Sequence, residues 1–175
     1  HVGRPKGKFK NELSLQPIRD NLSLQVNENV KLEKTNIFNL KKSELFKDDK
    51  GNIIILENIR FYPEEENNNE KFSEHLSKLG DIYVNDAFSC SHREHASVAS
   101  ITKFIPSFSG LQINSEVEAL KRITTEIKKP ITCIIGGSKI STKIDIIKNL
   151  IPKFDNFIIV GAMANNIFKY KGHNI

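Results

Sequence analysis

The stretch DIYVNDAFSCSHREHAS, residues 81–97, decides the fold class that this sequence predicts. Its apolar run Ile82–Val84 predicts a buried strand. A polar turn with Asn85 and Asp86 follows at once. In open sheets of parallel strands, ligands bind at the carboxyl ends of the strands. We therefore expect an α/β protein with a binding site directly after this strand.

A compact cationic cluster follows the same strand. It consists of His92, Arg93 and His95. A guanidinium between two imidazoles is suited to a phosphate or a carboxylate, because several N–H donors converge on the oxygens of the anion. The two histidines could also bind a metal. No nearby set of Cys, Asp or Glu completes such a site, so we favour an anion.

Strands and helices alternate along the rest of the chain. Apolar runs predict strands at 52–56, 82–84, 131–135 and 156–160, and residues 30–32 are a further strand candidate. Helical periodicity and capping residues predict helices over 70–79, 115–127 and 141–154, a helix that begins at Ser14 and a helix that follows Gly161. Ser115 is the expected cap of the helix at 115–127. Phe72, Leu76 and Leu79 share the inward face of the helix at 70–79. Pro106 and Gly110 predict a loop over 101–111. The alternation predicts parallel βαβ units.

The composition is that of an ordinary globular protein, with 38% hydrophobic and 27% charged residues. The net charge of +5 comes mostly from scattered lysines, which we interpret as a solvated surface. Aromatic residues are not interleaved with them, which disfavours nucleic-acid binding. No run approaches the roughly 18 apolar residues of a membrane span. Cys90 and Cys133 lack zinc spacing and favour a reducing cytoplasm.

Two further loops could take part in binding. In the segment GGSKISTK, residues 136–143, glycines follow a strand and allow the backbone to approach a ligand. Lys139 is expected in the turn and Lys143 one helical turn later, so both could reach one phosphate chain. A capped helix with solvated lysines explains the segment as well. Small residues in VGAMA, residues 160–164, would admit the flat face of a nucleobase or allow tight helix packing.

Arginines and histidines from separate loops complete the basic set. His1, Arg4 and Arg60 lie in loops next to predicted strands, as does the cluster at 92–95. Because the carboxyl ends of parallel strands meet at one sheet edge, these loops are expected to converge there. Their guanidinium groups are suited to bidentate contacts with an anion.

Five segments, in this order, resemble phosphoglycerate kinase. They are HVGRP at 1–5, LENIRFYPEEE at 56–66, DIYVNDAFSCSHREHAS at 81–97, IIGGSKISTKIDII at 134–147 and VGAMA at 160–164. They are similar to the family's H-L-G-R-P, L-L-E-N-L-R-F-x-x-x-E-E, D-x-Y-V-N-D-A-F-x-x-x-H-R-x-H-A-S, I-x-G-G-A-K-V-x-D-K-I and G-G-G-M-A patterns. Val160 and Ala162 stand where the last pattern has glycine. The resemblance runs the full length of the chain.

The resemblance implies two Rossmann-like three-layer domains with parallel sheets, joined by a helix. It implies transfer of a phosphoryl group between 1,3-bisphosphoglycerate and ADP, which gives 3-phosphoglycerate and ATP in glycolysis. Arg93 and Lys139 would be catalytic. The phosphoglycerate would be bound by His1, Val2, Gly3, Arg4, Arg60, His92, Arg93 and His95, and the nucleotide by Gly137, Lys139, Lys143 and Gly161.

The expected domain division follows from the same resemblance. Residues 1–110 would bind phosphoglycerate, 111–128 would form the interdomain helix, and 129–175 would begin the nucleotide domain. Both domains are expected to be incomplete, without the family's first strand and without the segment that holds Mg²⁺, so no residue of this chain is expected to bind that ion. We expect limited stability and no turnover from such a piece, with a non-catalytic phosphoglycerate-binding module as the alternative. A cytoplasmic monomer is expected.

Overall fold

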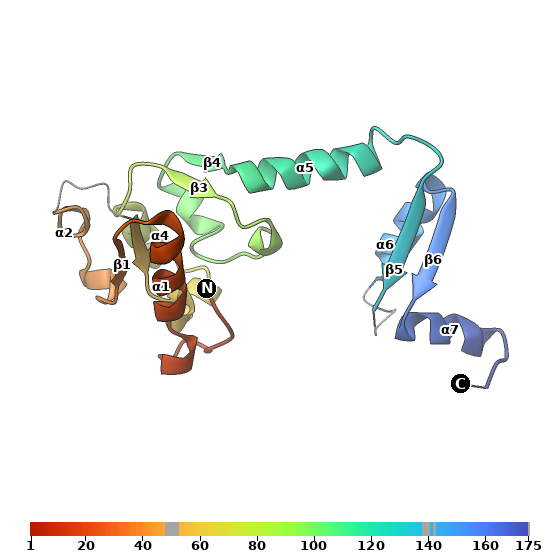
Figure 1. Cartoon of the computed structure of the whole chain (residues 1–175), viewed down its shortest axis with the longest axis horizontal. Coiled ribbons are helices and arrows are strands. Elements are labelled where there is room, and N and C mark those ends of the chain that lie inside the picture. Colours follow the sequence, from red (N-terminus) through yellow and green to blue (C-terminus); the bar gives the residue numbers. More distant parts are fainter. Residues whose placement is uncertain (48–52, 138–140, 142, 175) are drawn as a thin grey trace. The chain divides into compact units, whose positions relative to one another are not determined.

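The computed structural model describes residues 1–47, 53–137, 141 and 143–174. The chain divides into two compact units, His1–Asn114 and Ser115–Ile175. Helix α5, Leu111–Thr124, runs across the division (Figure 1). Both units are built from pairs of parallel strands with helices between them, as the alternating pattern predicts. The predicted α/β class is confirmed.

The first strand pair of unit 1 joins β1, Val30–Glu33, to β2, Ile53–Leu56. The strands are parallel, with Val30 opposite Ile53 and Glu33 opposite Leu56. Both strands were predicted. The predicted start of the second, Asn52, lies outside the described residues. Helix α1, Gln16–Val26, leads into this pair and packs against β1.

The second strand pair of unit 1 joins β3, Tyr83–Asn85, to β4, Ser107–Ser109, also in parallel. A strand was predicted here, but the prediction that it is buried was wrong. Val84 and its neighbour Phe108 are 49% and 59% exposed, because nothing among the described residues covers that face. The prediction of a loop over 101–111 was also wrong, since backbone pairing with β3 makes a strand of a segment that local sequence marks as irregular.

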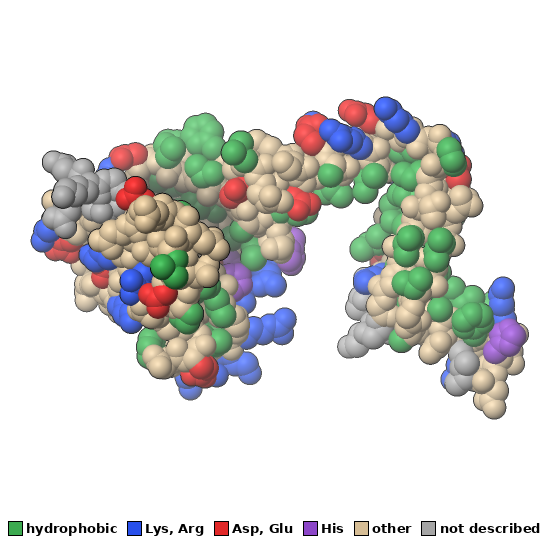
Figure 2. All heavy atoms as spheres, viewed as in Figure 1, with side chains coloured by type: hydrophobic (Ala, Val, Ile, Leu, Met, Phe, Trp, Pro, Cys, Tyr) green, Lys and Arg blue, Asp and Glu red, His purple; other side chains and the backbone are tan. Residues whose placement is uncertain are grey.

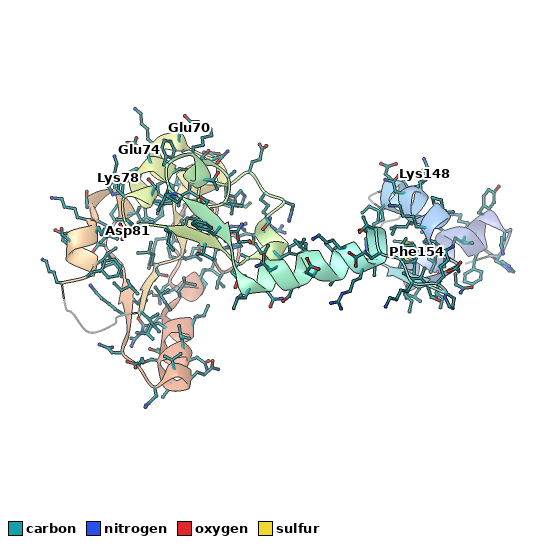
Figure 3. All side chains as sticks on the ribbon, turned by 90° about the horizontal axis from the view of Figure 1, so that it is seen from above. Glu70, Glu74, Lys78, Asp81, Lys148 and Phe154 are labelled. Carbon is teal, nitrogen blue, oxygen red and sulfur yellow. The ribbon has the colours of Figure 1, made fainter. Side chains whose placement is uncertain are left out.

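The core of unit 1 lies around helix α4, Glu70–Ser77. Phe72, Leu76 and Leu79 are buried, as predicted. On the outer face of α4, Lys78 donates to Glu74 at 2.8 Å (Figure 3). The shorter helices α2, Lys42–Leu45, and α3, Pro63–Glu66, complete this unit.

Unit 2 holds β5, Thr132–Gly136, and β6, Asn156–Val160, which pair in parallel (Figure 1). Helix α6, Ile144–Leu150, connects the two strands, and α7, Ala162–Tyr170, follows β6 and packs against both strands. Met163 of α7 is fully buried. The prediction that the strand at 131–135 is buried was wrong, because Ile134 is 66% exposed.

Two predicted helices have different limits in the structure. Helix α5 begins at Leu111, not at Ser115, because Oδ1 of Asp86 accepts a hydrogen bond from the Ile113 amide at 3.0 Å and so caps the first turn from a distant part of the chain. The helix predicted at 141–154 is shorter. Helix α6 ends at Leu150, and a 3₁₀ turn at Ile151–Lys153 contains Pro152.

Candidate anion-binding site

Asn58 anchors the N-terminal loop beneath the candidate site. Its side chain is fully buried just after β2. Its Nδ2 donates to the carbonyl oxygens of Val2 at 2.8 Å and Leu13 at 2.9 Å. Its Oδ1 accepts from the Arg60 amide at 3.2 Å. One amide therefore joins the loop that begins the chain to the loop that carries Arg60.

Gly3 allows the N-terminal loop to pass close to Leu13. Its φ of +64° lies in the left-handed region, which favours glycine. A Cβ at this position would lie 2.6 Å from Cδ2 of Leu13. Both the backbone conformation and the close approach therefore require glycine here.

Glu57 fixes the segment that follows this loop. Its carboxylate accepts hydrogen bonds from the Ser14 hydroxyl at 2.6 Å and from the amides of Leu15 and Asn58, each at 2.8 Å. Burial raises the pKa of Glu57, but these three donors together outweigh it and hold the pKa below its ordinary value. The carboxylate is thus stabilised as the anion.

Arg60 is the buried cation of the site, with only 3% of the residue exposed. Its Nη1 donates to the carbonyl oxygen of Gly3 at 3.4 Å and lies 3.7 Å from Oε1 of Glu66. Nε and Nη2 are buried and have no acceptor among the described residues. Buried donors without partners are costly, so an acceptor oxygen beside these two nitrogens would stabilise them.

The second cationic loop, residues 92–97, is held on the neighbouring helix α3. Glu65 accepts two hydrogen bonds from Ser97, and its Oε1 lies 3.7 Å from Nδ1 of His95. Because Glu66 of the same helix pairs with Arg60, α3 joins the loop of His95 to the loop of Arg60. The three loops therefore meet on the segment 57–66.

The predicted substrate residues differ in how firmly they are held. Val2, Gly3, Arg60 and His95 have the anchors just described. His1, Arg4 and His92 are exposed, and Arg93 is half-buried. Figure 2 shows histidine side chains next to Lys and Arg side chains on this unit. The sequence reasoning missed Asn58 and Glu65, although an amide directly after an apolar run is a usable signal.

The predicted nucleotide residues lie in unit 2. Gly137 has a φ of +144°, and a Cβ there would lie 2.9 Å from Nζ of Lys143. Nζ of Lys143 donates to the carbonyl oxygen of Gly136 at 2.7 Å. Lys143 directly precedes α6, so the prediction that it lies one turn into the helix was wrong. Gly161 has a φ of +65° and faces open space, and Lys139 lies outside the described residues.

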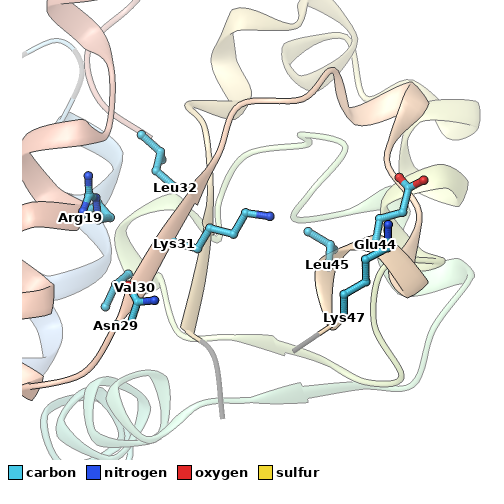
Figure 4. Close-up of a pocket in the computed structure, with 8 residues that line it drawn as sticks. All are labelled: Arg19, Asn29, Val30, Lys31, Leu32, Glu44, Leu45 and Lys47. Carbon is cyan, nitrogen blue, oxygen red and sulfur yellow. The ribbon is translucent and has the colours of Figure 1, made fainter. Parts of the chain in front are cut away.

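A separate cavity of about 490 Å³ opens beside β1 (Figure 4). Lys31 extends from β1 towards Leu45 across it, and Arg19 of α1 lies on the other side of the strand. None of the predicted site residues lines this cavity.

Two kinds of feature are absent from the described part of the chain. No three side chains of His, Cys, Asp or Glu gather there closely enough to hold a metal ion. No helix among the same residues has the length and apolar character needed to cross a membrane.

These features define a parallel α/β protein with an arginine- and histidine-bearing face at its strand ends. The family model described as phosphoglycerate kinase matches residues 1–175. The chain belongs to the phosphoglycerate kinase family.

Known relatives agree with this assignment. The chain is 42% identical to the phosphoglycerate kinase of Bartonella bacilliformis and 45% identical to that of Wolbachia pipientis subsp. Culex pipiens, in each case over all of this chain and 44% of the relative. The solved phosphoglycerate kinase of Coxiella burnetii matches with a TM-score of 0.81 at 36% identity, over all of this chain and 44% of that one. The chain thus spans less than half the length of these relatives.

Proposed function

We propose that unit 1 binds phosphoglycerate through the loops that meet on residues 57–66, with contacts from His1, Val2, Gly3, Arg4, Arg60, His92, Arg93 and His95. The observation that carries the proposal is the Arg60 guanidinium, which is buried and has two nitrogens without an acceptor among the described residues. A phosphate or carboxylate offers paired oxygens that match this planar donor fork.

We further propose that the chain serves phosphoryl transfer between 1,3-bisphosphoglycerate and ADP as part of a protein of its relatives' length. Gly137, Lys143 and Gly161 would contact the nucleotide. Lys139 would neutralise charge on the transferred group, and Arg93 would orient it. Mg²⁺ would accompany the nucleotide phosphates, with its protein ligand outside this chain. The 111–128 helix would join the two domains of a cytoplasmic, monomeric enzyme.

Calorimetric titration with 3-phosphoglycerate tests the binding proposal. The chain is expected to bind it saturably, and Arg60→Lys, which keeps the charge but removes the fork, is expected to weaken binding at least about tenfold. Arg19→Lys is the matched control, because Arg19 lies outside the proposed site. Absence of binding, or equal affinity in Arg60→Lys, would contradict the proposal.

A coupled assay with ATP and 3-phosphoglycerate separates the kinase from a binding module. Turnover by this chain would support the enzyme directly. Binding without turnover would favour the module for the chain by itself. The kinase proposal would then be tested on a protein of the relatives' length that contains this sequence, where Lys139→Ala should abolish activity.

A further inference from the structure

Glu65 is a buried carboxylate beside the proposed substrate site. Only 2% of the residue is exposed. The Ser97 amide donates to Oε2 at 2.9 Å, and the Ser97 hydroxyl donates to Oε1 at 2.7 Å. Nδ1 of His95 lies 3.7 Å from the same Oε1. A carboxylate away from water needs such donors, so its position and that of residues 95–97 depend on each other.

The backbone of this segment is fixed as well. The Ala96 amide donates to the carbonyl oxygen of Glu65 at 2.9 Å, and the Ser73 hydroxyl of α4 donates to the carbonyl oxygen of Ala96 at 2.9 Å. Ala96 and Ser73 are both fully buried. Residues 95–97 are therefore held between α3 and α4, while His92 and Arg93 are carried on the part of the loop that precedes this anchor.

Replacement by glutamine would invert one of these contacts. Glutamine has nearly the same shape but only one acceptor oxygen, so it could accept from the Ser97 amide only if the Ser97 hydroxyl turned to accept from its NH₂ group. Hydrogen bonds to charged groups contribute more than neutral ones, so replacing the carboxylate by an amide weakens the contacts that hold Ser97. The weakened hydrogen bonds would destabilise the loop that carries His92, Arg93 and His95.

We propose that Glu65 is a positioning residue that fixes the 92–97 loop and thereby places its cationic side chains for phosphoglycerate. The binding role rests on the proposed function; the fixing of the loop does not. Glu65 itself is not expected to touch the substrate, because its carboxylate is already occupied by Ser97 and His95.

Three measurements on the chain test this inference. Glu65→Gln is expected to accelerate amide hydrogen exchange at Ser97 and to weaken 3-phosphoglycerate binding, each by about tenfold or more. It is also expected to shift the His95 ring signals in NMR spectra, while the Phe72 amide in the core keeps its protection. Glu64→Gln makes the same chemical change one residue away on α3 and is expected to alter none of these.

The outcomes separate the two proposals. If the unaltered chain does not bind 3-phosphoglycerate, the proposed function is wrong. Amide hydrogen exchange at Ser97 then tests by itself whether Glu65 fixes the 92–97 loop. If Glu65→Gln keeps the original affinity and Ser97 exchange, the inference is wrong. If Glu65→Gln unfolds unit 1, Ser97→Ala replaces it: this variant removes one donor and is expected to shift the His95 ring signals with Phe72 still protected. Unshifted signals would overturn the inference.

Discussion

Asn58 shows how a single buried amide determines the place of a loop. Its side chain satisfies two carbonyl oxygens, those of Val2 and Leu13. Asn58→Ala leaves both without this donor and is expected to lower the free energy of unfolding by about 2 kcal/mol or more. Urea titration monitored by circular dichroism measures the change. Asn21→Ala on the exposed side of α1 is the control, and an equal effect in both variants would contradict this role.

Glu33 makes the stability depend on pH. The hydrogen bond from Lys31, and then those from Thr35, lower its pKa from 4.5 to about 2 in the folded chain. A depressed folded pKa stabilises the fold above pH 4.5, and this contribution is lost as the pH falls towards 2. Glu33→Gln is therefore expected to be less stable than the unaltered chain at pH 7, with a difference that shrinks between pH 4.5 and 2.

The magnitude of this effect is small. Lys31 is half-exposed, so water screens the pair and the difference at pH 7 is expected to stay below about 1 kcal/mol. Urea unfolding at a series of pH values measures it, and Lys31→Met should reproduce most of it. A difference between Glu33→Gln and the unaltered chain that does not change with pH would contradict the assignment.

The sequence predicts the charge and hydrogen-bonding groups of the site residues more readily than it predicts their burial and their contacts. Arginines and histidines after apolar runs indicate anion binding, and Arg60 is among them. That Arg60 is buried, and that Glu65 holds the neighbouring loop, depends on contacts across 30 or more positions of the chain. No local pattern specifies such partners, so these features become visible only in the folded chain.

At the scale of elements, the start of α5 depends on the approach of Asp86 to Gly110. A Cβ on Gly110 would lie 2.3 Å from Cγ of Asp86. Gly110→Ala is expected to displace Asp86, break its hydrogen bond to the Ile113 amide and cost about 1 kcal/mol or more. Faster hydrogen exchange at Ile113 reports the loss. Gly80→Ala, where the nearest atom would lie 3.5 Å away, is the control. Unchanged exchange at Ile113 would contradict this account.

The positions of most strands and helices were predicted correctly, whereas the burial of the strand faces was not. Short apolar stretches bounded by turn residues located β2, β3, β5 and β6, and the apolar residues Val30 and Leu32 located β1, because these patterns can be read locally. Burial of the strand faces and the presence of β4 were not predicted correctly, since both depend on which elements pack together. The early start of α5 was missed for the same reason, as its cap comes from Asp86, 25 or more positions away.

At the scale of the whole molecule, the two compact units are expected to respond separately to damage in one core. The buried cluster around Phe72 belongs entirely to unit 1. Phe72→Ala is expected to destabilise that unit by about 3–5 kcal/mol. Amide exchange in β5 and β6 should stay unchanged, which NMR measures residue by residue. Equal acceleration in both units would show that the chain unfolds as one cooperative body.

The burial of Arg60 has a consequence for behaviour in concentrated salt. Charges on the exposed lysines are screened within about 8 Å at physiological ionic strength. A guanidinium enclosed by protein is shielded far less, so its attraction for an anion persists when the surface field has faded. We therefore expect the lysines to raise the rate at which an anion associates in dilute buffer, and Arg60 to set its rate of dissociation in concentrated salt.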